Sequence, residues 1–431
     1  MAMDNKVKFD AEKDSLQTKK WFFPFILVTS LFFFWGFVHN LDPILIPHLR
    51  KAFRLNDLQS SLVDSAVFIA YFLMSLPAGY FMRKYGYKAA IIFGLVLFGV
   101  GSILFVPAAD TLKYGFFLGA LFIIASGLTF LETAANPYIT LLGPPETATK
   151  RLNFSQSFNG LAAYIAPTFI GPLILSGINL SEVEIENLPA DALKSYLALE
   201  ASSVKLPYLI LGIIILLVAI LFYFTKMPEI KDASESTDSE PTIKDALQSK
   251  QLRWGIVAQF FYVGAQVCVG SFFIKMATTS AGLDEDTSAK FLGFYGLSFM
   301  LGRFFGTYFM QFVLPKRLLS IYAIICLLLT CYVIFGSGIS VVYTLIAISF
   351  FMSIMFPTIF SIGIEGLGEH TKIGSSLIVM SIVGGALLPP LLGYISDSTS
   401  NIQYGYIVPS LCFLVVFVFS IANIQVQKVG K

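Results

Sequence analysis

The chain has 431 residues, of which 56% are hydrophobic, 15% aromatic and only 13% charged, and its mean hydropathy is +0.76. Charged residues make up about a quarter of an ordinary soluble domain, so this composition excludes a soluble globular protein, a disordered chain and a disulfide scaffold. The 29 Lys and Arg residues against 27 Asp and Glu residues give a formal net charge of +2, too balanced for a nucleic-acid-binding protein. A polytopic membrane protein remains.

Apolar tracts recur along the whole chain, and each is long enough for a transmembrane helix of about 20 residues. The tracts are continuous and do not alternate between polar and apolar positions, so they predict helices and not barrel strands. We predict an all-α membrane protein with twelve transmembrane helices. They lie in 21–49, 59–82, 89–109, 114–143, 152–181, 206–225, 254–274, 291–314, 318–364 (two helices that meet at Gly336-Ser337-Gly338), 373–396 and 402–425.

Basic residues are concentrated in alternate connecting segments. With the N-terminus inside, the inner segments carry 20 Lys and Arg residues and the outer loops carry 8, so both termini are predicted to be cytoplasmic. A polar linker in the middle of the chain separates two six-helix halves. The predicted organisation is a cytoplasmic tail (1–20), an N-terminal half (21–226), a cytoplasmic linker (227–252), a C-terminal half (253–425) and a second cytoplasmic tail (426–431).

A short pattern occurs twice, about 220 residues apart, and favours an internal duplication of the kind found in two-half transporters. Each copy has a proline inside a span, followed by a Gly-rich loop that holds an acid and a lysine. The copies are Pro137 with Glu146 and Lys150, and Pro357 with Glu369 and Lys372.

Glu132 lies near the middle of its span, and Asn136 follows one turn later on the same face. A charge in the bilayer costs about 2.5–3.5 kcal/mol even on insertion scales, so a lone acid at this depth needs a reason. Two interpretations are open: an acid that carries a proton or binds substrate, and a buried acid neutralised by Arg303. We favour the first.

Asp42 shares one helix face with Trp35 and His39, since His39 and Asp42 follow Trp35 by four and seven residues. Pro43 removes the hydrogen bond to the carbonyl of His39. A broken helix with an acid, an aromatic ring and the amide of Asn40 suits a sugar-like solute. The alternative is a kink near the outer interface with Asp42 directed to water, and both remain open.

Two further charges lie within the predicted spans. Asp64 is near the outer end of its span, which favours a gate or a helix-packing charge. Arg303 is mid-span and is either a structural counter-charge, which we favour slightly, or a gating partner.

Two stripes of polar side chains lie in opposite halves, and amides that both donate and accept hydrogen bonds suit a hydroxyl-rich ligand. The alternative is hydrogen bonding between helices, which is common in membranes. Their placement in both halves favours a shared central cavity. The stripes are Asn153, Gln156 and Asn159 in the first half and Gln259, Tyr262 and Gln266 in the second.

Nothing in the sequence indicates a cofactor or a metal. The four cysteines lie in apolar tracts and are interpreted as small hydrophobes, and the three histidines are too scattered for a metal site. No ATP-binding motif is present, so transport would draw on an ion gradient or on the gradient of the solute itself.

Strings in both halves resemble the fucose permease family of the major facilitator superfamily. They are Ser30–Gly36, Leu131–Tyr138, Leu142–Pro144, Arg151–Asn159, Gln259–Gln266, Gly302–Thr307, Phe356–Ser361 and Gly374–Met380. The resemblance implies a major facilitator fold and sugar:proton symport by alternating access. It also implies that Glu132 is an essential protonatable acid and that Gln156 and Asn159 contact the sugar.

The chain departs from that family's pattern at two places. Relatives carry a second coupling acid in the first helix, and here Asp42 stands one residue earlier while Pro43 occupies the usual position. A shift of one residue turns a side chain by roughly 100° around the helix. Phe356 stands where the family has a tyrosine.

We therefore predict a monomeric transporter of the inner membrane that imports a fucose-like monosaccharide with protons. The alternatives are a uniporter or sodium-coupled carrier of another hexose, such as glucose or galactose, and a non-transporting membrane sensor, which would normally carry an attached soluble signalling domain. We assign proton coupling to Glu132 and Asp42. We assign sugar binding to Gln156, Asn159, Asn136, Trp35, His39, Asn40, Gln259, Tyr262 and Gln266, and gating or structural charge to Asp64 and Arg303.

Overall fold

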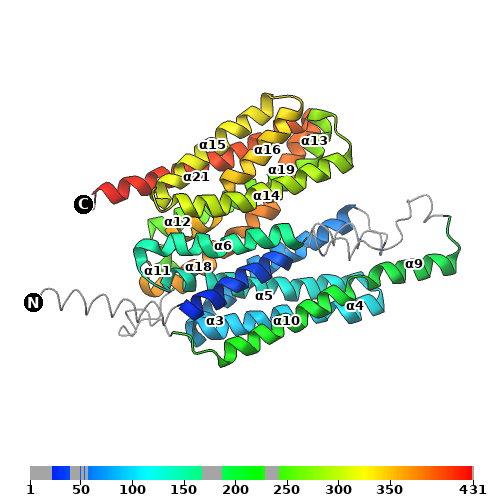
Figure 1. The fold of residues 1–431 in the computed structure, drawn as a ribbon, viewed down its shortest axis with the longest axis horizontal. Helices are drawn as coiled ribbons and strands as arrows, with labels where there is room; N and C mark the ends of the chain where they lie inside the picture. The colour runs from blue at the N-terminus through cyan, green and yellow to red at the C-terminus, as the bar shows by residue number, and fades with distance from the viewer. Residues whose placement is uncertain are drawn as a thin grey trace, which may run out of the picture.

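The computed structural model describes residues 22–38, 49, 53, 57–166, 187–228 and 242–429. Helices account for most of these residues, and none of the described residues lies in a β-strand, which confirms the all-α prediction. Figure 1 shows the helices in two groups, one built from the first half of the chain and one from the second.

The N-terminal group begins with the Phe22–Val38 helix. It continues with α3 (Asp57–Ile103), α4 (Phe105–Thr111), α5 (Tyr114–Leu141), the 3₁₀ turn η1 (Pro145–Thr147), α6 (Ala148–Ile165), α9 (Ala190–Ser202) and α10 (Lys205–Phe224).

The C-terminal group follows a short helix, α11 (Ile243–Ala246). It consists of α12 (Lys250–Ser271), α13 (Phe273–Ala281), α14 (Glu285–Phe309), α15 (Pro315–Phe335), α16 (Ile339–Met352), α17 (Met355–Ile364), η3 (Gly368–His370), α18 (Thr371–Met380), η4 (Ser381–Val383), α19 (Gly384–Thr399), α20 (Ile402–Gly405) and α21 (Ile407–Val429).

Local sequence explains where these helices begin and end. The side chains of Thr242 and Asp245 form a capping box at α11, and this hydrogen bonding holds the pKa of Asp245 below its ordinary value. Asp284 caps α14 by accepting from the backbone N–H of Thr287. Gly338 adopts a φ of 69° at the predicted turn between α15 and α16.

Each of the twelve predicted spans coincides with helical residues in the described part of the chain. Eight helical segments there are long and apolar enough to cross a membrane. One of them, α3, contains two predicted spans that meet at Gly86, where φ is 82°. The residue bounds of the two halves and the cytoplasmic placement of the termini stay predictions.

Two details differ from the sequence prediction. Helix α9 was not predicted, because its moderately polar sequence lacks the long apolar tract that identifies a span. The span predicted at 152–181 begins earlier, at Ala148 of α6, and its residues 167–181 lie outside the described residues.

Large apolar side chains on the outer helices point away from the protein. Leu217 and Phe224 of α10 are 59% and 77% exposed, and Phe335 at the end of α15 is 83% exposed. A continuous apolar exterior of this kind fits lipid and not water. By contrast, every residue of α5 from Ile124 to Thr140 is buried, so this segment lies at the centre of the molecule.

The two groups meet mainly at one end of the molecule, which we call the α11 end because it also holds η1, α11 and η3. There α3 and α5 contact α18, and α6 contacts α14 and α17. In Figure 1 the groups diverge toward the opposite end, which holds α9 and α13. The arrangement is closed at the α11 end.

Close helix contact in the N-terminal group depends on glycine. A Cβ atom added at Gly127 of α5 would lie 2.5 Å from the backbone nitrogen of Phe98 in α3. Gly94 of α3 faces the same contact, since its Cβ would lie 2.9 Å from the carbonyl oxygen of Gly127. Small residues at such positions let helix backbones approach closely in membranes.

We expect Gly127→Ala to destabilise the purified protein by about 1–3 kcal/mol, because the added methyl group displaces backbone that has no room to yield. Gly119→Ala in the same helix is the matched control, since a Cβ there meets nothing within 4 Å. Thermal unfolding in detergent measures both. Equal transition temperatures for the two variants would contradict the close contact.

Candidate substrate and proton site

Glu132 lies in the buried segment of α5, and its side chain is 8% exposed. The hydroxyl of Tyr71 is its hydrogen-bonding neighbour, while Oε2 has no hydrogen-bond partner among the described residues. A buried carboxyl with one unsatisfied oxygen is a group that can take up a proton or accept a hydrogen bond from a ligand.

The amide stripe of α6 meets α5 one helical turn beyond Glu132. The Nε2 of Gln156 donates to the Oδ1 of Asn136 over 3.2 Å, and both side chains are buried. The Nδ2 of Asn136 has no partner within the described structure. This unpaired donor and the unpaired Oε2 of Glu132 are one turn apart on the same helix.

Arg303 of α14 joins this cluster from the other helix group. Its Nη1 donates to the backbone oxygen of Gln156 over 2.6 Å and to the Oδ1 of Asn159 over 3.2 Å. Its Nε donates to the backbone oxygen of Ser353 over 3.0 Å, within its own group. The guanidinium is only 4% exposed and therefore bridges α6 and the C-terminal group inside the protein.

Arg303 also interacts electrostatically with Glu132 and Tyr262. The described salt bridges include no direct pair of Arg303 with Glu132. The guanidinium is satisfied by neutral oxygens and acts on the carboxyl at longer range. Glu132, Asn136, Gln156, Asn159 and Arg303 form one connected cluster, which we call the central network.

The polar stripe of α12 is only partly joined to the central network. The hydroxyl of Tyr262 donates to the backbone oxygen of Met352 over 3.0 Å, and its ring meets Phe356 edge-on. Gln259 is fully buried, and neither of its amide atoms has a partner in the described part of the chain. Gln266 is half-buried.

Two predicted sugar-binding residues, Trp35 of the Phe22–Val38 helix and Asn159 of α6, lie in different environments. Trp35 is 2% exposed and packs on Phe32, with ring centroids 4.2 Å apart. Asn159 is half-buried and lies against Gly36, where an added Cβ would come 2.7 Å from its Cγ. The structure therefore places Trp35 in packing and Asn159 at a junction of three helices.

The side chains of four predicted site residues fall outside the described part of the structure. His39, Asn40 and Asp42 lie outside the described residues. Asp64 lies in α3, but the structure does not describe its side chain. Their assigned roles stay predictions.

Polar contacts between the two helix groups at the α11 end join α6 to α17 and α18 to α5. The bond of Asn153 agrees with the inter-helix alternative stated for its stripe. The bonds of Thr149 and Ser375 were not predicted, although clustered Ser and Thr could have indicated close helix contact. The contacts are Thr149 Oγ1 with Ser361 Oγ (2.8 Å), Asn153 Nδ2 to Thr358 Oγ1 (3.1 Å) and Ser375 Oγ to the backbone oxygen of Thr133 (2.7 Å).

The repeated sequence pattern has a structural counterpart. In both halves a fully buried helix segment leads through a 3₁₀ turn into a helix that contacts the other group: α5, η1 and α6 in one half, and α17, η3 and α18 in the other. The buried acid, the inter-group contacts and the duplicated scaffold together define a two-half membrane transporter.

Comparison with known proteins identifies the family. The model of the Major Facilitator Superfamily matches residues 25–381, so the chain belongs to the Major Facilitator Superfamily. This finding confirms the predicted fold class and the resemblance noted in the sequence.

Two characterised relatives are similar over nearly their whole length. The chain is 40% identical over 415 residues to the L-fucose-proton symporter of Escherichia coli (strain K12), covering 95% of each protein. It is 39% identical over 402 residues to a glucose/galactose transporter of Brucella abortus, covering 92% of each. The crystal structure of FucP in the outward conformation matches with a TM-score of 0.87, covering 93% of this chain and 98% of that one.

We expect Thr149→Cys combined with Ser361→Cys to form a disulfide, because their hydroxyl oxygens are 2.8 Å apart across the two groups. The bond should stop transport, and reduction should restore it. The background carries Cys331→Ser, since Cys331 is exposed while the other three cysteines are buried. Gel mobility after cleavage at a protease site inserted between α10 and α11 measures the link.

Each single-cysteine variant is a control for oxidation alone. Undiminished transport by the fully cross-linked protein would show that the α11 ends do not need to separate.

Proposed function

We propose that the protein is a secondary active transporter of the inner membrane that imports a monosaccharide together with protons by alternating access. Two kinds of observation support this function. Similarity to an L-fucose-proton symporter extends over 95% of the chain, and a carboxyl group lies buried at the centre of the molecule. The transport unit is one chain, because both helix groups and all members of the central network come from it.

The observation that carries the coupling proposal is the setting of Glu132. Its carboxyl has an unpaired oxygen, and Asn136, one turn away, bonds Gln156, which contacts Arg303. Protonation removes the charge with which Arg303 interacts, so a proton on Glu132 changes the electrostatics at the junction of the two groups. The same cluster has amide groups that suit sugar hydroxyls, and this supports the proposal that proton and sugar share one site.

The closed α11 end supports an orientation for this conformation. The segments predicted to lie inside carry 20 Lys and Arg residues, whereas the outer loops carry 8. The connecting segments at the α11 end are among those predicted to lie inside. The cavity for sugar would then open outward. Release inside requires the contacts of Thr149, Asn153 and Ser375 to break.

Neutral contacts suit such a gate. Each hydroxyl or amide bond contributes about 0.5–1.5 kcal/mol net, so a few of them hold the closed state without preventing its opening.

Two kinds of sugar are candidates for the substrate. A fucose-like sugar is favoured by the L-fucose-proton symporter, and glucose or galactose is favoured by a relative of nearly equal identity. Phe356, whose ring meets Tyr262, offers no hydroxyl to the ligand. A sugar with fewer hydroxyl groups, such as a 6-deoxy sugar, leaves fewer unpaired donors beside such a ring, and we therefore propose L-fucose first.

Uptake into proteoliposomes tests the function directly. We expect labelled L-fucose to accumulate when an inward proton gradient is imposed, and sugar added to unbuffered vesicles should alkalinise the medium as protons enter. A proton ionophore should abolish accumulation. Competition by unlabelled glucose and galactose ranks the sugars.

Uptake that ignores the pH gradient and responds to sodium, or to neither ion, would replace symport by the sodium-coupled or uniport alternative. Accumulation of galactose in preference to fucose would retain the symport and change the substrate.

Glu132→Gln should separate binding from coupling. Glutamine keeps the shape and hydrogen bonding of the protonated acid but cannot release a proton, so sugar binding and exchange between preloaded vesicles should survive. Proton-driven accumulation should be lost, since coupling to the membrane potential is worth about 2.3 kcal/mol per 100 mV for each charge carried. Both assays are run on one preparation.

Glu146→Gln is the matched control, because Glu146 lies exposed in η1 and outside the central network. Accumulation at the parent level in Glu132→Gln would remove Glu132 as the coupling acid and transfer that role to Asp42.

A further inference from the structure

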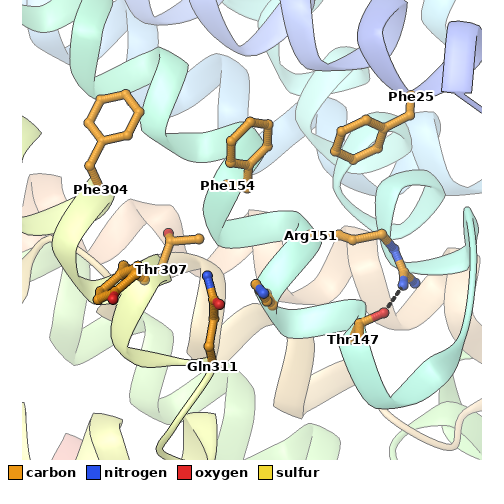
Figure 2. Close-up of a pocket in the computed structure, with 9 residues that line it drawn as sticks. Phe25, Thr147, Arg151, Phe154, Phe304, Thr307 and Gln311 are labelled. Atoms are coloured by element: carbon orange, nitrogen blue, oxygen red, sulfur yellow. Dashed lines mark hydrogen bonds between the residues drawn. The ribbon is translucent and has the colours of Figure 1, made fainter.

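A cavity of about 520 Å³ lies at the α11 end, on the side of the molecule where α6 crosses α14. Its walls come from both helix groups: Phe25 and the start of α6 on one side, and the last turns of α14 on the other. Figure 2 shows the side chains that line it. None of them belongs to the central network, so the cavity is separate from the proposed sugar site.

The walls change from polar to aromatic along the helix axes. Thr147, the last residue of η1, lines the cavity, and so does Phe154 of α6, seven residues later. Phe304 of α14 also lines it, and so does Gln311, which follows the end of α14 and comes seven residues after Phe304. Figure 2 shows the phenylalanine rings of Phe25, Phe154 and Phe304 toward one end of the cavity and the side chains of Thr147 and Gln311 toward the other. Seven residues of helix span about 10 Å, so both walls change from polar to aromatic over a distance of roughly that size.

The polar end carries positive charge. Lys150 lines the cavity and has no hydrogen-bond or ion-pair partner among the described residues. Arg151 also lines it and donates to the backbone oxygens of Ile139, Thr140 and Pro144. No acidic side chain is among the lining residues. Glu146, which interacts electrostatically with Arg151, is not among the residues that line the cavity.

The aromatic end is open to the surroundings of the protein. Phe154 is 40% exposed and Phe304 is 36% exposed, although each lies two turns or less from the cavity's polar end. A soluble anion has no apolar part that could pack against these rings. A molecule with an anionic head and an apolar tail complements both ends of the cavity at once.

We propose that this cavity binds an anionic phospholipid, with its phosphate at Lys150 and Arg151 and an acyl chain along Phe25, Phe154 and Phe304. The lipid comes from the leaflet at the α11 end, where polar head groups and hydrocarbon meet within about 10 Å of depth. Because its walls belong to both helix groups, the lipid fits only while α6 and α14 are adjacent. Its binding therefore favours the conformation that is closed at the α11 end.

Quenching by brominated lipid tests the proposal in the full-length protein. Phe304→Trp places a fluorophore in the aromatic end, and the signal of the parent, which has three tryptophans, is subtracted. The protein is reconstituted in phosphatidylcholine with increasing amounts of phosphatidylglycerol brominated in its acyl chains. Tyr308→Trp, at another lining position, is the reporter if Phe304→Trp does not fold.

The reporter should be quenched at a far lower fraction of brominated phosphatidylglycerol than of brominated phosphatidylcholine. Lys150→Gln should raise the half-saturating fraction of phosphatidylglycerol about fivefold, the effect of one cation at an anionic membrane surface. Lys84→Gln is the matched control, because Lys84 is an exposed cation outside the cavity that contacts the ring of Tyr85. It should leave the fraction unchanged.

Equal quenching by the two lipids, or no effect of Lys150→Gln, would show ordinary annular lipid and overturn the proposal. An equal effect of Lys84→Gln would also overturn it, because surface potential would then explain the preference. Glycerol phosphate should not compete, since it lacks the acyl chain. Competition at millimolar concentration would identify a site for soluble anions in place of lipid.

Discussion

The buried guanidinium of Arg303 is the constraint on which the centre of this molecule depends. A cation cannot be left unsatisfied in a low-dielectric interior, and moving it to water is not possible from the middle of a span. Its hydrogen bonds to Gln156, Asn159 and Ser353 satisfy it with oxygens from both helix groups. Any motion that separates α6 from α14 therefore has to offer the guanidinium other acceptors. In the proposed mechanism, a hydroxyl of the bound sugar or the deprotonated carboxylate of Glu132 supplies them, and the conformational change is coupled in this way to sugar and proton.

Much of this arrangement follows from the sequence, and what does not follow has identifiable causes. Hydropathy predicts the spans because lipid demands long apolar helices, and the rarity of charge at depth singles out Glu132 and Arg303. The partners of Arg303 were not predicted, since two of its acceptors are backbone oxygens, which every residue carries. The contact at Gly127 was not predicted either, because the sequence alone does not distinguish a helical glycine that faces open space from one that packs against another helix, as Gly127 packs against α3. Helix α9 was missed because its moderately polar sequence lies outside the long apolar tracts that identify spans.

The duplicated scaffold also shows where the two halves have diverged. Shifting α5 by 220 residues places Glu132 on Met352 and Asn136 on Phe356, while the prolines coincide. Both segments are buried, so the second copy matches the first in packing but has apolar side chains at the positions of Glu132 and Asn136. A second buried carboxyl would add its own desolvation cost and would repel the first. In the proposed mechanism, one acid in one half acts at longer range on an arginine from the other half and carries the effect of protonation across the junction. The second copy contributes the hydroxyl groups of Thr358 and Ser361 to the contacts between the two groups.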